Sequence, residues 1–237
     1  MTNNNKHSPV INKLRRGLIV SCQAEGESPF NNPEGVTGFA LCAQIGGAVA
    51  IRAEGVMNIS AIKQNVQLPV IGLVKSLFED GSVRITGSEQ EAKGLMEAGC
   101  DIIAIDGTFR LREGKSGPEF IRFIKEKYRL PLMADISTFE EALACQQAGV
   151  DCISTTLSGY TPATTNRSEK GPDFDLLAKL VQAMGDSTPV IAEGRINSPA
   201  LARQAIDLGA WAVVAGTAIT RPQIITKWYY DAINKEI

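Results

Sequence analysis

Short apolar runs, each followed by a polar or small residue, recur along the whole chain. They read LIVSC, AVAI, PVIGLV, DIIAI, PLMA, DCIS, PVIA and AVVAG. A parallel strand that is covered on both faces of its sheet has such a near-continuous sequence of Val, Ile, Leu and Ala. The pattern therefore predicts eight buried parallel strands.

Amphipathic segments with helix start signals lie between these runs. Ser88, Ser137 and Ser198 stand where N-caps are expected, Pro199 occupies a first helical position, and Glu140 would complete a capping box with Ser137. Several helical patterns end on glycine, which adopts the left-handed conformation after a helix at low cost. Strands and helices thus alternate, which favours parallel pairing through right-handed crossovers.

Eight strands and about eight helices in 237 residues fit one closed (β/α)8 barrel, the TIM-barrel architecture. An open doubly wound sheet usually has a GxGxxG turn after its first strand, and this chain has none there. We expect residues 14–237 to form one catalytic barrel, preceded by a flexible extension over residues 1–13. Residues 76–87 are expected to add a hydrophilic loop with a short strand. Residues 157–172 are expected to form a lid over the barrel mouth, or else an ordinary surface loop.

Composition narrows the function classes. The formal net charge of −2 offers no basic face for nucleic acid, and no apolar stretch is long enough for a membrane span. The first residues lack the apolar core of a signal peptide, so we expect a cytoplasmic protein.

The cysteine and histidine content limits the chemistry further. The five cysteines show no CxxC spacing and are expected to be small core residues, although Cys22 is close enough to the mouth to touch a ligand. The only histidine is His7, in the N-terminal segment, which excludes a His-based triad and His-rich zinc sites from the barrel. We expect no metal, and proton transfer falls to Lys, Asp, Glu or Tyr.

Polar side chains close most of the predicted strands, and parallel barrel strands all end at one mouth. Lys75 is a candidate base or nucleophile, because an apolar wall would favour its neutral amine; the alternative is a lysine that extends to solvent. Glu193 lies on the seventh predicted strand, opposite the third, which carries Lys75. This pair could exchange protons on two faces of one carbon, or Glu193 could pair with Arg52 or Arg195.

Other strand ends offer binding groups. Arg52 is suited to hold an anionic oxygen, while Gln23 and Asp135 could bind hydroxyls or orient the lysine, and Thr156 lies beside them. Asp106 could do the same or pair with a nearby arginine.

The last two strand–helix loops are typical of a phosphate site. Their candidate residues are Gly194, Arg195, Gly216, Thr217 and Arg221.

The segments GLIVSCQ, GAVAIRAEGV, PVIGLVK, RITGS, DIIAIDGT, MADIST, STTLSGYTP, VIAEGRIN and AITRPQ occur in this order. Over about residues 14–235 the chain resembles the N-acylglucosamine-6-phosphate 2-epimerase family. The resemblance implies a ribulose-phosphate-binding type barrel that interconverts N-acetylmannosamine 6-phosphate and N-acetylglucosamine 6-phosphate in sialic acid catabolism, without a cofactor. It implies a catalytic lysine at Lys75 with Glu193 as its partner, and a phosphate-holding arginine at Arg221. It places the supporting polar groups at Gln23, Arg52 and Asp135.

Some positions depart from the family pattern. Many relatives have arginine directly after the lysine, where this chain has Ser76, and Thr217 stands where Gly or Ser is frequent. A Schiff-base aldolase and a non-catalytic phosphosugar-binding barrel remain alternatives. The amphipathic C-terminal segment could form a homodimer contact or pack on its own barrel.

Overall fold

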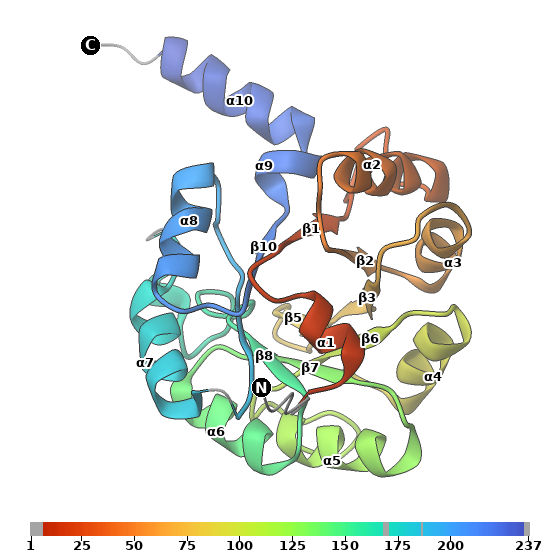
Figure 1. The fold of residues 1–237 in the computed structure, drawn as a ribbon, viewed down its shortest axis with the longest axis vertical. Coiled ribbons are helices and arrows are strands. Elements are labelled where there is room, and N and C mark those ends of the chain that lie inside the picture. Colours follow the sequence, from red (N-terminus) through yellow and green to blue (C-terminus); the bar gives the residue numbers. More distant parts are fainter. Residues whose placement is uncertain (1–6, 168–170, 186, 235–237) are drawn as a thin grey trace, which may run out of the picture.

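The computed structural model describes residues 7–167, 171–185 and 187–234, and its centre is a closed barrel of eight parallel strands (Figure 1). Neighbouring strands follow the order β1-β10-β9-β8-β7-β6-β3-β2 around the ring. The predicted (β/α)8 fold is confirmed. The barrel strands are β1 (Leu18–Cys22), β2 (Ala50–Glu54), β3 (Val70–Leu73), β6 (Ile102–Asp106), β7 (Leu132–Asp135), β8 (Cys152–Ser154), β9 (Val190–Ala192) and β10 (Ala212–Ala215).

Helices form an outer layer around the strands (Figure 1). They are α2 (Pro33–Ile45), α3 (Val56–Asn65), α4 (Glu89–Glu97), α5 (Gly117–Lys127), α6 (Phe139–Gln147), α7 (Phe174–Met184) and α8 (Pro199–Asp207). Ser88 caps α4 in a capping box with Glu91, and Ser198 caps α8, both as predicted.

Helix α6 begins one residue later than predicted. Its N-cap is Thr138, which forms the capping box with Glu141, so the predicted pair of Ser137 and Glu140 is wrong. The Ser137 hydroxyl instead donates a hydrogen bond of 2.8 Å to the same Glu141 carboxylate.

Side chains alternate between two apolar layers along each strand, as the period of two requires. Ile19, Ile71 and Met133 belong to the cluster inside the barrel. Ile51 and Ile103 belong to the cluster under the helices. A residue two positions beyond an interior residue points inward again, now at the mouth. This alternation determines which strand-end side chains face a common space.

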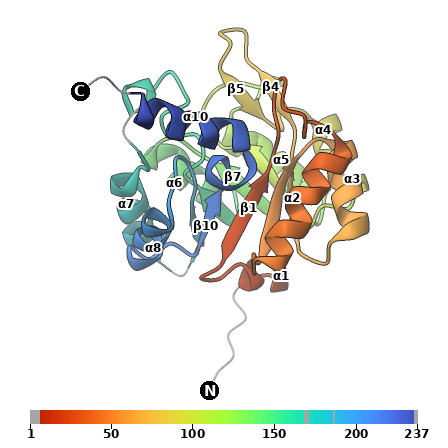
Figure 2. The same cartoon turned by 90° about the horizontal axis from the view of Figure 1, so that it is seen from above.

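Helix α1 (Pro9–Lys13) lies across the N-terminal end of the barrel (Figures 1 and 2). Ile11 and Leu14 are fully buried in the same cluster as the barrel interior, and Trp211 Nε1 donates a hydrogen bond of 2.9 Å to the Ile11 carbonyl. Residues 9–13 of the extension predicted over residues 1–13 thus form a helix that packs against the barrel. Residues 1–6 lie outside the described residues.

Two segments elaborate the opposite, C-terminal end of the barrel. Strand β4 (Lys75–Leu77) pairs antiparallel with β5 (Val83–Ile85), forming a hairpin that projects beyond the barrel (Figure 2). The prediction of an extra short strand within residues 76–87 is confirmed. Between β8 and α7 runs the long predicted loop, which contains the short 3-10 helix Thr165–Arg167.

The chain ends in α9 (Thr217–Thr220) and α10 (Pro222–Ile233), and α10 extends away from the barrel (Figure 1). None of the residues of α10 is buried. No described helix combines the length and the apolar character needed to cross a membrane.

Candidate active site at the C-terminal mouth of the barrel

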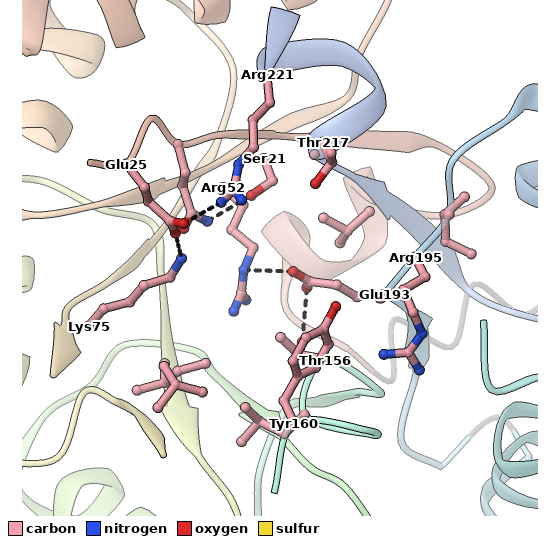
Figure 3. A pocket seen from close by; sticks show the side chains of 18 of the residues that line it. Ser21, Glu25, Arg52, Lys75, Thr156, Tyr160, Glu193, Arg195, Thr217 and Arg221 are labelled. Atoms are coloured by element: carbon pink, nitrogen blue, oxygen red, sulfur yellow. Dashed lines mark hydrogen bonds and ion pairs between the residues drawn. The ribbon is translucent and has the colours of Figure 1, made fainter. Parts of the chain in front are cut away.

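A cavity of about 360 Å³ opens where the parallel strands end (Figure 3). The residues predicted for the site line this cavity, except Asp135, which lies fully buried beneath it, and the further candidate Asp106, which is also fully buried. The lining residues with polar side chains include Ser21, Gln23, Glu25, Arg52, Lys75, Thr156, Tyr160, Glu193, Arg195, Thr217 and Arg221.

Lys75 and Glu193 approach the cavity from opposite sides. Lys75 follows β3 and Glu193 follows β9, and these strands are four places apart in the ring of eight. The predicted placement across the mouth is confirmed. A bound carbon between the two side chains would therefore present one face to an amine and the other to a carboxyl group.

The surroundings of Lys75 differ from the expected apolar wall. Lys75 is the first residue of the hairpin strand β4, and its side chain is 32% exposed. Its ammonium forms an ion pair with Glu25 in the loop after β1 (Figure 3). The amine therefore lies next to a carboxylate at a partly exposed position, and not against an apolar wall.

Glu193 belongs to a buried cluster of charges with Arg52 and Asp135. Arg52 Nη2 lies 2.5 Å from Asp135 Oδ2, and Arg52 Nε lies 3.3 Å from Glu193 Oε1. The alternative pairing of Glu193 with Arg52 is therefore present, whereas Arg195 binds elsewhere. One guanidinium holds both carboxylates, which fixes the orientation of Glu193 toward the cavity.

The Thr156 hydroxyl contacts the same two carboxylates, those of Asp135 and Glu193. Its Oγ1 lies 2.8 Å from Asp135 Oδ1 and 3.0 Å from Glu193 Oε2. The Ser154 hydroxyl lies 2.8 Å from Thr156 Oγ1 and 3.3 Å from Glu193 Oε2. Because a hydroxyl has a single proton, Thr156 can donate to only one carboxylate at a time. The chain from Asp135 through Thr156 to Glu193 can thus exist in more than one protonation pattern.

Burial controls the charge state of this cluster. Desolvation raises the pKa of Asp135 from 3.8 to about 6, although Arg52 opposes the shift, and the nearby Glu193 charge acts in the same direction as burial. Burial alone would lower the pKa of Arg52, but Asp135 and Glu193 outweigh it and raise that pKa, so the guanidinium stays charged. Asp135 is therefore a carboxyl group that can change protonation near neutral pH.

Gln23 presents an unused acceptor at the cavity. Its Nε2 donates a hydrogen bond of 2.7 Å to Ser21 Oγ, while its buried Oε1 has no hydrogen-bond partner among the described residues. Such an oxygen is suited to accept a hydrogen bond from a bound molecule. Cys22, between them, points to the outer apolar layer, and burial raises the pKa of its thiol to about 12. Its side chain does not line the cavity.

Arg195 contacts the cavity but uses its guanidinium on the loop after β8. Its Nε donates a hydrogen bond of 2.6 Å to the Gly171 carbonyl, and its Nη2 donates one of 3.0 Å to the Ser158 carbonyl. The guanidinium also lies 5.1 Å from the ring of Tyr160, which lines the cavity from this loop. Arg195 therefore ties both ends of the predicted lid to the strand that carries Glu193.

Arg221 is the cation on the remaining side of the cavity. It follows α9, near Gly194, Gly216 and Thr217, which line the same space. Gly194 has a φ of +107°, a conformation that a residue with a side chain rarely adopts. Arg221 Nη2 lies 2.9 Å from Glu25 Oε2.

Asp106 is not part of the site. Its carboxylate is fully buried and lies 2.8 Å from Arg110 Nη2 and 3.0 Å from Arg112 Nη2. The alternative that it pairs with a nearby arginine is thus the one the structure supports.

No group of three or more His, Cys, Asp or Glu residues that could hold a metal ion occurs in the described part of the chain.

Several lining residues were absent from the predicted site, among them Glu25 and Tyr160. Both lie in strand–helix loops rather than at strand ends, so the pattern of apolar runs gave no indication of them. For Tyr160, the predicted position of residues 157–172 at the mouth was the only available signal.

Comparison with known proteins identifies related chains. Residues 36–235 match the family model NanE, described as "Putative N-acetylmannosamine-6-phosphate epimerase". A protein of Caldanaerobacter subterraneus subsp. tengcongensis named as such a 2-epimerase is 46% identical over 95% of this chain and 94% of that protein. Its counterpart in Clostridioides difficile is 45% identical over 95% of this chain and 99% of that protein.

Solved structures agree with the sequence relatives. The N-acetylmannosamine-6-phosphate 2-epimerase from Clostridium perfringens superimposes with a TM-score of 0.87 at 41% identity, covering 95% of this chain and 97% of that chain. A thiamine phosphate pyrophosphorylase from Pyrococcus furiosus, 17% identical with a TM-score of 0.59, shares the fold alone. These matches cover most of the chain at well over 30% identity, so the chain belongs to the N-acetylmannosamine-6-phosphate epimerase family.

Proposed function

We propose that the chain interconverts N-acetylmannosamine 6-phosphate and N-acetylglucosamine 6-phosphate by removing and returning the proton on C2, a step of amino sugar catabolism. The observation that carries this proposal is the entry of Lys75 and Glu193 into one cavity from opposite strands, beside the cation Arg221. The names of the relatives supply the substrate.

The reaction needs the open-chain sugar. Only there does the C1 aldehyde accept the electron pair of the broken C2–H bond, forming an enolate. The neutral Lys75 amine takes the C2 proton and becomes an ammonium. A protonated Glu193 returns a proton to the opposite face of C2, and the aldehyde re-forms with inverted C2. Water then takes the proton from Lys75 and returns one to Glu193, which restores the starting state. Positioned acid–base groups of this kind contribute about 10²- to 10⁴-fold in rate.

The remaining site residues hold the substrate and the acid. Arg52 and Thr156 orient Glu193, and Asp135 supports Arg52 from below. The free Oε1 of Gln23 accepts a hydrogen bond from a substrate hydroxyl or amide.

Arg221 holds the phosphate, and Gly194 and Gly216, which have no side chain, let the backbone approach it closely beside Thr217. Arg195 holds the lid through Nε and Nη2, and its buried Nη1, which has no hydrogen-bond partner among the described residues, is left to donate to the phosphate. Binding at the phosphate, away from C2, favours the reactive geometry.

A proton NMR time course on N-acetylmannosamine 6-phosphate in heavy water tests the proposal. We expect the signals of the 2-epimer to appear with deuterium at C2, and we expect Lys75→Ala to bind the sugar but turn over at least about 10²-fold more slowly. Near wild-type turnover in that variant would refute the role of Lys75. Product that keeps the original C2 proton would favour one base over two. Binding without C2 exchange, or a borohydride-trapped adduct on Lys75, would contradict the epimerase assignment.

We also propose that the chain forms a homodimer through α10. Trp228, Tyr229 and Ile233 on this helix are 39%, 71% and 79% exposed. Between α8 and the outer faces of β1 and β10 lies a groove of about 530 Å³, lined largely by apolar side chains such as those of Val213 and Ile206. This groove is where a barrel normally packs its last helix, and α10 of a second copy would cover it.

Light scattering after size exclusion tests the dimer. The wild type should have twice the chain mass of 25.4 kDa, and Trp228→Asp should have the mass of one chain. Ile45→Asp, at a residue 86% exposed on α2, is the matched control and should remain dimeric. A wild-type mass of one chain would exclude the dimer.

We propose a cytoplasmic location as well, since all five cysteines are free thiols and suit a reducing compartment. Recovery of the protein in the periplasmic or secreted fraction of its cells would contradict this.

A further inference from the structure

One carboxylate bridges the two cations that the proposed reaction uses for different purposes. Glu25 Oε1 pairs with the Lys75 ammonium, and Glu25 Oε2 lies 2.9 Å from Arg221 Nη2 (Figure 3). These two cations are 146 residues apart in the chain, and no other carboxylate pairs with either of them among the described residues. Glu25 thus connects the proposed base with the proposed phosphate anchor.

A phosphate on Arg221 is incompatible with this arrangement. Phosphate and carboxylate oxygens accept hydrogen bonds from the same N–H donors of a guanidinium, and two anions bound to one guanidinium repel each other. Partial burial alone would raise the pKa of Glu25, but Lys75 and Arg221 outweigh it and hold that pKa below 4.5. Glu25 is therefore charged at neutral pH, and an incoming phosphate must displace it.

Little free energy is needed to displace the Glu25 carboxylate from this position. Its side chain is 48% exposed and lies in the loop between β1 and α2, so a released carboxylate moves directly into water. Ion pairs this exposed contribute little to stability, and contacts with a phosphate dianion can replace them. The same movement removes the partner of the Lys75 ammonium.

We infer that Glu25 is an internal occupant of the anion position on Arg221, and that an arriving phosphate displaces it and thereby frees the Lys75 amine. This inference rests on the proposed roles of Arg221 and Lys75. Glu25 is accordingly a positioning residue that links binding of the phosphate end of the substrate to the availability of the base. A sugar without phosphate has no group that replaces the carboxylate on Arg221, so Lys75 stays paired.

The first test measures the binding of inorganic phosphate by calorimetry. Glu25→Gln should bind phosphate about 3- to 10-fold more tightly than the wild type, because the competitor has lost its charge. Glu27→Gln removes the same charge from an exposed position of the same loop and should bind like the wild type. Equal affinity in the two variants, or weaker binding by Glu25→Gln than by the wild type, would overturn the inference.

The second test measures how fast acetic anhydride modifies the Lys75 amine, read by peptide mass spectrometry against Lys93 on α4. In the wild type, inorganic phosphate should accelerate the modification of Lys75 relative to sodium chloride of equal ionic strength. In Glu25→Gln the modification should be fast without phosphate. A rate that phosphate does not change in the wild type would overturn the link to Lys75. Neither test measures epimerisation, so the outcome is independent of whether the proposed function holds.

Discussion

Replacing Asp135 by Asn should change how the stability of the protein depends on pH. Asp135 is fully buried at the end of β7, 2.5 Å from Arg52 and 2.8 Å from the Thr156 hydroxyl. Asn has nearly the same shape and cannot ionise, so the substitution separates the effect of the charge from that of packing. The absolute change in stability combines several effects, whereas its pH dependence reports ionisation in the buried cluster that contains Asp135.

The sign follows from the direction of the pKa shift. The pKa of Asp135 is about 6 in the folded chain against 3.8 as the ordinary value, so the folded state holds this proton more tightly. The resulting stabilisation is fully present below about pH 4 and is lost as the pH rises through about 6. The difference between the two pKa values corresponds to roughly 3 kcal/mol in all, of which about 1 kcal/mol is lost between pH 5 and pH 7.

Urea unfolding at pH 5 and pH 7 measures this quantity in the wild type and in Asp135→Asn. The free energy of unfolding of the wild type should fall by about 1 kcal/mol more than that of the variant over this interval, after the common background is subtracted. Asp175→Asn, at an exposed residue on α7, is the control and should follow the wild type. A pH dependence of Asp135→Asn that equals the wild type's would show that Asp135 ionises normally and that this reasoning about burial is wrong.

Three further substitutions test other contacts of the fold and site. Thr156→Val removes the hydroxyl that contacts Glu193 and should lower kcat by about 10-fold or more, while Thr156→Ser keeps most of it; equal loss in both would argue against the hydrogen bond. Arg195→Met should speed tryptic cleavage after Arg167, because the loop after β8 loses two hydrogen bonds from Arg195. An unchanged cleavage rate would show that these hydrogen bonds do not hold the loop in place. Ile11→Ala should destabilise the chain by about 2–5 kcal/mol in urea unfolding with kcat/KM unchanged, and a change below about 0.5 kcal/mol would show that α1 does not seal the barrel.

The sequence alone determined the fold and the ends of the strands. Parallel strands have a continuous apolar pattern, and caps such as Ser88 and Ser198 act over three or four residues, so these signals are local. Because a barrel of eight strands has a fixed geometry, counting strands was enough to place Lys75 opposite Glu193. Where two caps were adjacent, as at Ser137 and Thr138, sequence could not decide between them.

The tertiary structure decided which charged groups pair with each other. Arg52 pairs with both Asp135 and Glu193. Glu25 pairs with both Lys75 and Arg221. These partners are far apart in the sequence, so no local pattern indicates the pairs. Each of these pairings depends on how far the side chains reach and how deeply they are buried at the mouth of the barrel. From the sequence alone, several other carboxylates were equally good candidates for the same ion pairs. The same holds for the packing of α1 under the barrel and the projection of α10 away from it, because an amphipathic helix shows that it has an apolar face but not which surface will cover that face.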